Sequence, residues 1–161
     1  MTDPIHGEPG VVIRDACVAD LAAVVSLYAD DAIGASREAP GQPLDPAYVR
    51  GFAAIEADPR SRLIVAEVEG RVVGTLQLTY LPGVNRRGAE RAQIEAAHVA
   101  GDVRNRRIGR RLVAYALTEA RAHGAVLAQL TTDGRRGAAH RFWLSCGFEA
   151  SHIGMKQTLS R

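Results

Sequence analysis

The chain has 161 residues, of which 47% are hydrophobic and 24% are charged, and its formal net charge is +2. This length suits one domain with a single core, and the composition excludes a generally disordered chain. The small net charge excludes a polycation that coats nucleic acid, so any basic function must be local.

The cysteines and the N-terminus narrow the class of protein further. Cys17 and Cys146 are the only cysteines and lie far apart in the sequence, which argues against a disulfide framework or a zinc site. No basic start followed by an apolar run opens the chain, and no apolar run reaches about eighteen residues. We therefore expect a cytoplasmic protein without a metal or a membrane partner, with a flexible N-terminus over residues 1–10 and one domain over residues 11–161.

The first half of the chain is predicted to contain a strand, two helices and a hairpin. A short strand over 11–14 precedes apolar residues at helical spacing over 18–33. The Gly- and Pro-rich segment 34–44 should be an irregular, exposed loop of a kind that often carries function. Asp45 followed by Pro46 is typical of a helix start. The β-branched residues that follow predict two strands joined at Glu69 and Gly70.

The second half predicts a strand, a crossover helix and a second strand. A turn-rich loop over 82–91 leads into the alternating segment AQIEAAHVAG, which we interpret as a central strand. A helix ending at Gly124 follows, then a strand (AVLAQLTT), a helix (RRGAAHRFWLSCG) and a closing strand or hairpin (FEASHIGMKQTL). This order predicts an α/β or α+β domain with a mixed sheet and a ligand at the crossover.

The arginine-rich stretch VRNRRIGRRLV, residues 103–113, lies at the junction of the central strand and the crossover helix. A helix that begins near Ile108 has unpaired N–H groups and the positive end of its dipole there, which favour a phosphate or pyrophosphate. Gly109 has no side chain to block the approach of such a ligand. The rival interpretation is a nucleic-acid patch, but no aromatic residues for base stacking interleave with the arginines.

This junction resembles the acyl-CoA signature of the GNAT acetyltransferases, in which Gln or Arg, two variable residues, Gly, one variable residue, and Gly or Ala follow one another. The segment from Arg104 to Gly109 stands at these six positions, with Arg107 in place of the first glycine. The late helix before Gly147 and Phe148 and the order of elements extend the resemblance from Val11 to about Leu159. The resemblance implies an α/β fold with a GNAT-type mixed central sheet flanked by helices, in which the central parallel strands splay apart.

The same resemblance implies where acetyl-CoA binds. Its pantetheine arm would pair with the backbone of Ala97, His98 and Val99, and its pyrophosphate would rest on the junction. The implied junction contacts are Arg104, Asn105, Arg106, Arg107, Ile108, Gly109 and Arg110. Arg136 stands where the family often has an asparagine, and it is a further candidate for CoA binding.

Glu95 is the candidate base, because transfer to an amine requires an unprotonated amine. Strict alternation places it on the same face as Gln93 and Ala97, and a carboxylate in a largely apolar strand is costly to bury without a role or a partner. The alternative is a structural contact of Glu95 with Arg91 or with a loop N–H. Alternation places the side chain of His98 on the face opposite Glu95, so we expect its backbone to serve the cofactor and its ring to be structural.

The proton donor and the acceptor site are less defined. Trp143 stands where the family usually has a proton-donating tyrosine, and an indole cannot serve as such an acid. The substitutes are Cys146, His140, Tyr80 or water, each of which also has a simple structural reading. On the acceptor side the candidates are Arg37, Glu38, Tyr48 and Tyr80, with solvated loop residues as the alternative.

The sequence therefore predicts an N-acetyltransferase that uses acetyl-CoA as cosubstrate. The acceptor would be a primary amine of a small molecule or peptide that attacks directly in a ternary complex. The alternative is a catalytically silent acyl-CoA-binding or regulatory domain of the same fold. Dimers are common among proteins of this type, so a homodimer is considered, and no nucleic-acid partner is expected.

Overall fold

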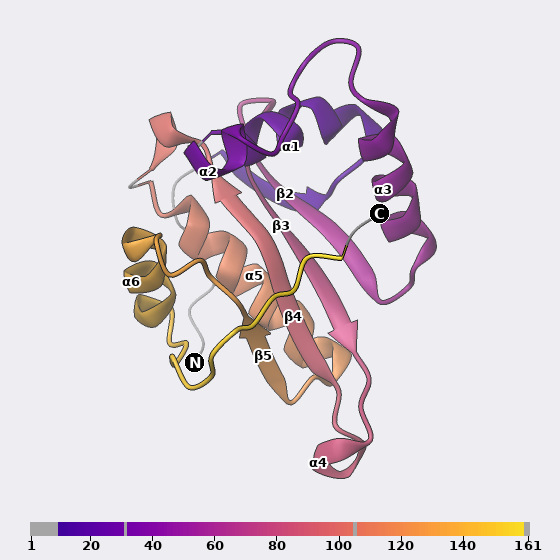
Figure 1. Cartoon of the computed structure of the whole chain (residues 1–161), viewed down its shortest axis with the longest axis vertical. Coiled ribbons are helices and arrows are strands. Elements are labelled where there is room, and N and C mark those ends of the chain that lie inside the picture. Colours follow the sequence, from indigo (N-terminus) through magenta and orange to yellow (C-terminus); the bar gives the residue numbers. More distant parts are fainter. Residues whose placement is uncertain (1–9, 31, 105, 160–161) are drawn as a thin grey trace.

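The computed structural model describes residues 10–30, 32–104 and 106–159, and these form a five-stranded sheet in the order β1-β2-β3-β4-β5 (Figure 1). The first four strands are antiparallel, and β5 runs parallel to β4. The strands are β1 (Val11–Asp15), β2 (Ser61–Val68), β3 (Arg71–Leu81), β4 (Arg91–Val99) and β5 (Leu127–Leu130). This mixed sheet with flanking helices confirms the predicted fold class.

Helices lie on both faces of the sheet. The longer ones are α1 (Leu21–Tyr28), α3 (Pro46–Ala57), α5 (Ile108–His123) and α6 (Gly137–Ser145). The short ones are α2 (Ala32–Ala35), α4 (Asn85–Gly88) and two 3-10 turns (Val18–Asp20 and Gly101–Val103). β4 ends at Val99 and α5 begins at Ile108, so the predicted junction of the central strand with the crossover helix is confirmed.

Local signals in the sequence fix several element ends. Glu69 (φ 50°) and Gly70 (φ 78°) form the two-residue turn between β2 and β3, the conformation that right-handed strand twist favours. The Asp45 carboxylate accepts a hydrogen bond from the Ala47 N–H at 2.8 Å and caps α3. Gly124, with φ of 95°, ends α5. These three predictions are confirmed.

The predicted helix over 18–33 is wrong in its extent. The chain makes a 3-10 turn over Val18–Asp20, then α1, and it leaves the helix after Tyr28. Asp30 lies beyond that end, and its carboxylate accepts a hydrogen bond from the Gly101 N–H at 3.0 Å. A contact this distant in sequence overrides the local helical pattern.

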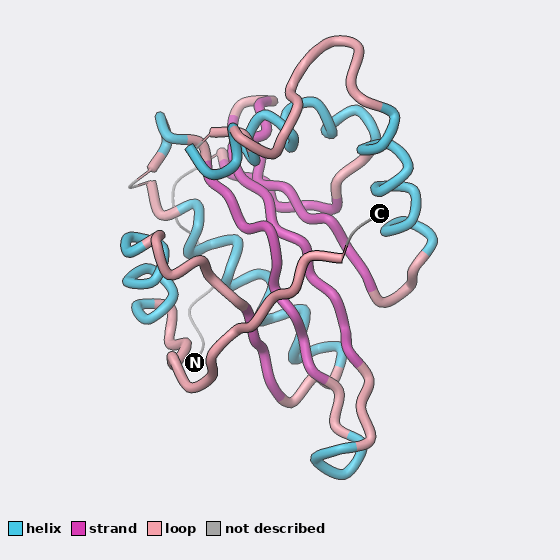
Figure 2. Tube along the Cα trace, in the orientation of Figure 1, coloured by secondary structure: helices cyan, strands magenta, loops and turns pink. Residues whose placement is uncertain are grey.

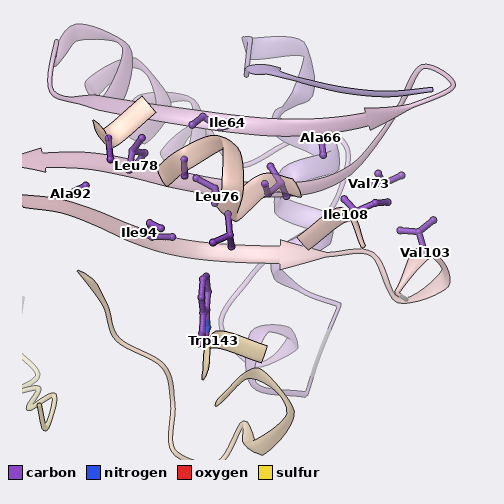
Figure 3. Close-up of a cluster of buried hydrophobic side chains, with 14 of the residues drawn as sticks. Ile64, Ala66, Val73, Leu76, Leu78, Ala92, Ile94, Val103, Ile108 and Trp143 are labelled. Atoms are coloured by element: carbon purple, nitrogen blue, oxygen red, sulfur yellow. The ribbon is translucent and has the colours of Figure 1, made fainter. Parts of the chain in front are cut away.

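Two apolar layers hold the helices to the sheet. On one face, α5 packs Ile108 and Leu112 against side chains such as Leu76, Leu78 and Ile94 (Figure 3). On the other face, α1 and α3 pack against β2 and β3 through a second cluster: Leu21, Val24, Phe52, Leu63 and Val65. On this second face, β4 and β5 carry polar residues instead, so the two layers do not cover the sheet equally.

The predicted closing strand or hairpin over the last residues is wrong. Residues 149–159 form no strand and run as a loop across the sheet (Figure 2). Within this segment Ile153 and Met155 are exposed, and β5 has only four residues with which a further strand could pair. In the part of the chain that is described, no helix is long and apolar enough to cross a membrane.

Candidate active site

The two parallel strands separate halfway along β4. They pair from Arg91 with Leu127 to Ile94 with Leu130, and the pairing ends there. A cavity of about 130 Å³ opens beyond this point, lined by three segments: 94–98 of β4, 130–133 after β5, and Arg136, Ala139 and Trp143 around α6. The splay that the family resemblance implied is thus present, and the cavity lies within it.

A β-bulge in β4 redirects the side chains at this cavity. Glu95 is paired with Gln77 and His98 with Thr75, so β4 holds one residue more than β3 over this stretch. Ala96 absorbs the extra length with φ of 49°. Because residues directly opposite each other share a face, Glu95 and His98 lie on the same face. The predicted opposition of these two side chains is wrong, and so is the shared face of Glu95 and Ala97.

The Glu95 side chain is exposed and lines the cavity. Within the described residues its carboxylate makes no hydrogen bond and no ion pair. The structural alternative of a contact with Arg91 does not occur, since the Arg91 guanidinium donates to Gln129 Oε1 at 3.3 Å. Because Glu95 is exposed, the cost of burying a carboxylate does not arise, and its carboxylate is free to meet a substrate.

His98 is packed at the other end of the bulge. Its ring lies edge-to-face with that of Tyr28, with 5.2 Å between ring centroids, and its Nδ1 is 3.2 Å from the carbonyl oxygen of Ala96. The Nε2 atom is buried and finds no partner among the described residues. Burial raises the pKa of Tyr28 to about 12, so this phenol stays neutral beside the imidazole.

Arg107 adopts a left-handed backbone conformation, with φ of 56° and ψ of 12°, at the N-cap of α5. Glycine adopts this conformation without the steric cost that a Cβ atom brings. The structure thus gives a physical reason for the coincidence of Arg107 with a glycine position of the signature. The next side chain, Ile108, is buried in the core, so that residue can offer a ligand only its backbone.

Gly109 serves helix packing. A Cβ atom on this residue would lie 3.2 Å from Cζ of Phe142 and 3.6 Å from Cγ2 of Val99. The missing side chain therefore admits the Phe142 ring of α6 against the first turn of α5. This reason differs from the close ligand approach that the sequence suggested.

Several arginines of the junction contact the protein itself. Arg104 lies 3.5 Å from the Asp30 carboxylate, and Arg110 donates to the carbonyl of Ser145 at 3.0 Å. Arg106 and Arg107 are exposed, and Asn105 lies outside the described residues. Arg136 lines the cavity at the N-cap of α6. The basic stretch thus combines structural contacts with exposed cationic groups.

The candidate acceptor residues are placed differently from one another. The Tyr48 hydroxyl donates to the Glu38 carboxylate at 3.0 Å and accepts from the Ala39 N–H at 2.9 Å, which ties the loop to α3. Arg37 is exposed on this loop. Tyr80 is buried on the face opposite Glu95, with its ring stacked on His123 at 3.6 Å between centroids. Tyr80 therefore lies on the other side of the sheet from the Glu95 side chain and does not line the cavity.

The late helix supplies a wall to the cavity. Trp143 points from α6 toward β4 (Figure 3) and makes edge-to-face contacts with Phe142 and Phe148, with centroids 5.1 and 5.5 Å apart. Cys146 is half-buried, and burial raises the pKa of its thiol. His140 is exposed on the same helix.

Sequence reasoning missed several residues at this site. Thr131, Thr132 and Asp133 line the cavity just after β5, at the carboxyl end of a crossover strand where ligands are expected in such sheets. Position alone could have identified them. Asp133 accepts hydrogen bonds from the Arg135 side chain at 2.7 and 3.0 Å, and these hold the pKa of the carboxyl well below its usual value.

Comparison with known proteins shows that this chain is similar to acetyltransferases. Residues 21–148 match the family described as the Acetyltransferase (GNAT) family. An aminoalkylphosphonate N-acetyltransferase from Salmonella typhimurium is 36% identical over 116 residues, which cover 70% of this chain and 73% of the relative.

Solved structures agree over almost the whole chain. A transcriptional regulator from Bacillus halodurans superposes with a TM-score of 0.90 at 41% identity, covering 92% of this chain and 99% of that one. A protein from Agrobacterium tumefaciens described as a putative acetyltransferase gives a TM-score of 0.80 at 27% identity, with the same coverage.

Proposed function

Because the chain belongs to the acetyltransferase (GNAT) family, we propose that it transfers the acetyl group of acetyl-CoA to the primary amine of a small molecule. The observation that carries this proposal is the cavity between β4 and β5. The exposed carboxylate of Glu95, next to the bulge in β4, lines this cavity. A base at the mouth of such a cavity suits an amine that must lose a proton before it attacks.

The residues around the cavity fit acetyl-CoA. Beyond Ile94 the β4 backbone has no β5 partner, so Ala97, His98 and Val99 can pair with the amide groups of a pantetheine arm. The first turn of α5 begins at the left-handed Arg107, and its N–H groups and dipole suit the pyrophosphate. Arg106 and Arg136 are the cationic side chains proposed to assist, and Arg107 is proposed to contribute its backbone N–H. When bound, acetyl-CoA supplies the activated acyl group.

We propose that the two substrates react directly in a ternary complex. Glu95 accepts a proton from the substrate ammonium, and the amine nitrogen then forms a bond to the acyl carbon. A β4 N–H stabilises the oxyanion while the carbon–sulfur bond breaks. After attack the nitrogen carries one proton more than the amide product. Water at the open end of the cavity accepts this proton and passes one to the departing thiolate, because the indole of Trp143 cannot supply it, so the products are the amide and the CoA thiol.

Release of free CoA thiol tests the proposal. Acetyl-CoA is incubated with the protein and a panel of amino acids, aminoalkylphosphonates, polyamines and aminoglycosides. We expect release with at least one amine and a fall in kcat of about 10²- to 10⁴-fold in Glu95→Gln. Thr118→Ala, an exposed change on α5, is the control and should leave kcat unchanged. Full activity of Glu95→Gln would remove the proposed base.

A second candidate is a catalytically silent acyl-CoA-binding or regulatory domain. It is favoured by the 41% identical relative that is described as a transcriptional regulator, and by Trp143 at the position of the usual proton donor. A thermal shift with acetyl-CoA, without thiol release across the whole panel, would support this candidate and not the enzyme.

We also propose that the protein is cytoplasmic and forms a homodimer. Size-exclusion chromatography with light scattering measures the dimer directly, and a monomeric mass at working concentration would remove it.

A further inference from the structure

A row of hydrogen-bonding side chains crosses β4 and β5 on the same face as Glu95. We call Arg91, Gln93 and Gln129 the polar row. Gln93 and Gln129 are paired across the two strands, and Gln129 Nε2 donates to Gln93 Oε1 at 2.7 Å. All three side chains are half-buried. The C-terminal segment crosses the sheet at the carboxyl end of β5, where Gly154 lies next to Thr131, whereas α1 and α3 cover β2 and β3 (Figure 1).

Arg91 is the cation of this row, and half of its guanidinium is unused. One amino group, Nη1, donates to Gln129 Oε1 at 3.3 Å. The Nε atom is buried without a partner, and within the described residues Nη2 has no acceptor either. Because Nε has almost no accessible surface, Nη2 is the donor that an anion from outside can reach, and a hydrogen bond from a guanidinium to a phosphate or carboxylate oxygen is strengthened by the charges of both groups.

The acidic groups near this part of the fold are engaged elsewhere. Glu90, the residue before Arg91, lies 3.0 Å from His123 Nε2. Asp133, beyond β5, is paired with Arg135 at 2.7 Å. In the described part of the chain Arg91 has no carboxylate partner, although a half-buried cation is ordinarily paired. An anion supplied by a ligand would give Nη2 the acceptor that the described residues do not provide.

The distance between Arg91 and Glu95 limits the size of such a ligand. The contact with Gln129 brings the guanidinium to the Gln93 level of the sheet. Glu95 is two residues further along β4, roughly 7 Å at the rise of a strand. A molecule that places an amine at Glu95 and an anion at Arg91 therefore needs only a few atoms between the two groups.

We propose that Arg91 binds the anionic group of the acceptor, so that the preferred substrate is a short amine carrying a phosphonate or another oxyanion. This inference rests on the proposed function, because it assigns the acceptor of that same site. Gln93 and Gln129 act as positioning residues, since they hold the guanidinium at the level from which it faces the amine. The aminoalkylphosphonate acceptor in the name of the 36% identical relative belongs to this chemical class.

Paired substrates test the assignment kinetically. The ratio of kcat/KM for 2-aminoethylphosphonate to that for the neutral 3-aminopropanol is measured with the wild type, Arg91→Lys, Arg91→Met and Arg121→Met. Arg121 is an exposed arginine on α5, which covers the other face of the sheet, and it controls for lost charge. We expect Arg91→Met to lower the ratio about 10- to 100-fold and to leave the Kd for acetyl-CoA unchanged. Arg91→Lys should retain part of the ratio.

Binding of methylphosphonate gives a readout that needs no turnover. Ligand-observed NMR at fixed ionic strength should show binding to the wild type and to Arg121→Met, and at least tenfold weaker binding to Arg91→Met. If methylphosphonate binds in this way but no amine releases CoA, the proposed function fails and the anion site stands. Equal binding by wild type and Arg91→Met, or a substrate ratio unchanged in Arg91→Met, would overturn the inference.

Discussion

Replacing Arg107 by glycine tests whether the backbone or the side chain of this residue matters at the start of α5. Arg107 has φ of 56°, a conformation that costs an L-residue about 1–2 kcal/mol and glycine almost nothing. Glycine also gives the unfolded chain more freedom, which costs about 0.4–1 kcal/mol of stability. The difference predicts a stabilisation of roughly 0.5–1 kcal/mol, which for a chain of this size raises Tm by about 1–4 °C.

Two further variants separate the possible causes. Arg107→Ala removes the same charge but keeps the Cβ atom, so its Tm should stay close to that of the wild type. Arg87→Gly changes another residue with positive φ, 59°, between β3 and β4. This variant should raise Tm without changing the affinity for acetyl-CoA.

Affinity decides which part of Arg107 meets the cofactor. We expect Kd for acetyl-CoA, measured by isothermal titration calorimetry, to stay within about twofold in Arg107→Gly, because the side chain is exposed and the N–H remains. A large loss of affinity in both Arg107→Gly and Arg107→Ala would instead assign a charge contact to the guanidinium. A Tm of Arg107→Gly no higher than that of Arg107→Ala would refute the strain argument itself.

Three other predictions follow from packing and charge. Gly109→Ala should cost about 1 kcal/mol more in the wild type than in a Phe142→Leu background, because the new Cβ meets the ring at 3.2 Å; equal costs by denaturant unfolding would contradict this. The hydrogen bond from Arg14 lowers the pKa of Asp20 to about 2, from about 4 in the unfolded chain. The resulting stability, about 2 kcal/mol, is complete above pH 4 and is lost as the pH falls through 2. Arg14→Met should therefore reduce the loss of unfolding free energy between pH 4 and pH 2. If that loss is unchanged in Arg14→Met, the Arg14–Asp20 pair is not its cause. Trp143→Tyr should place a phenol in the cavity wall and raise kcat while lowering Tm, and an unchanged kcat would show that this position supplies no proton.

The elements predicted best from the sequence are those fixed by neighbouring residues. The turn at Glu69 and Gly70, the cap at Asp45 and the stop at Gly124 each depend on backbone conformations that their own residues favour. The order of strands and helices then defines the sheet, and with it the place of the cavity. For this reason the junction before α5 could be located from the sequence alone.

Several of the errors share one cause, which is contacts between residues distant in sequence. The end of α1 depends on the contact of Asp30 with Gly101, and the role of Gly109 depends on a ring from α6. Tyr80 is paired with Ala92 and so faces the α5 side of the sheet, which the spacing of aromatics does not reveal. The sequence suggested Arg91 only as a partner for Glu95, because the unused hydrogen-bonding groups of Arg91 become apparent only in the folded structure.

The bulge at Ala96 changes how this strand should be read in related sequences. Before Ala96, neighbouring side chains on one face are two positions apart in the sequence. Glu95 and His98 also share a face, but they are three positions apart. A relative that lacks one residue here would return to strict alternation with its glutamate and histidine two positions apart and still on one face, whereas a relative of equal length without the bulge would turn its histidine toward α5. In an alignment of such proteins, a single-residue gap at the position of Ala96 therefore leaves the same groups facing the substrate, and the residues on either side of it remain equivalent.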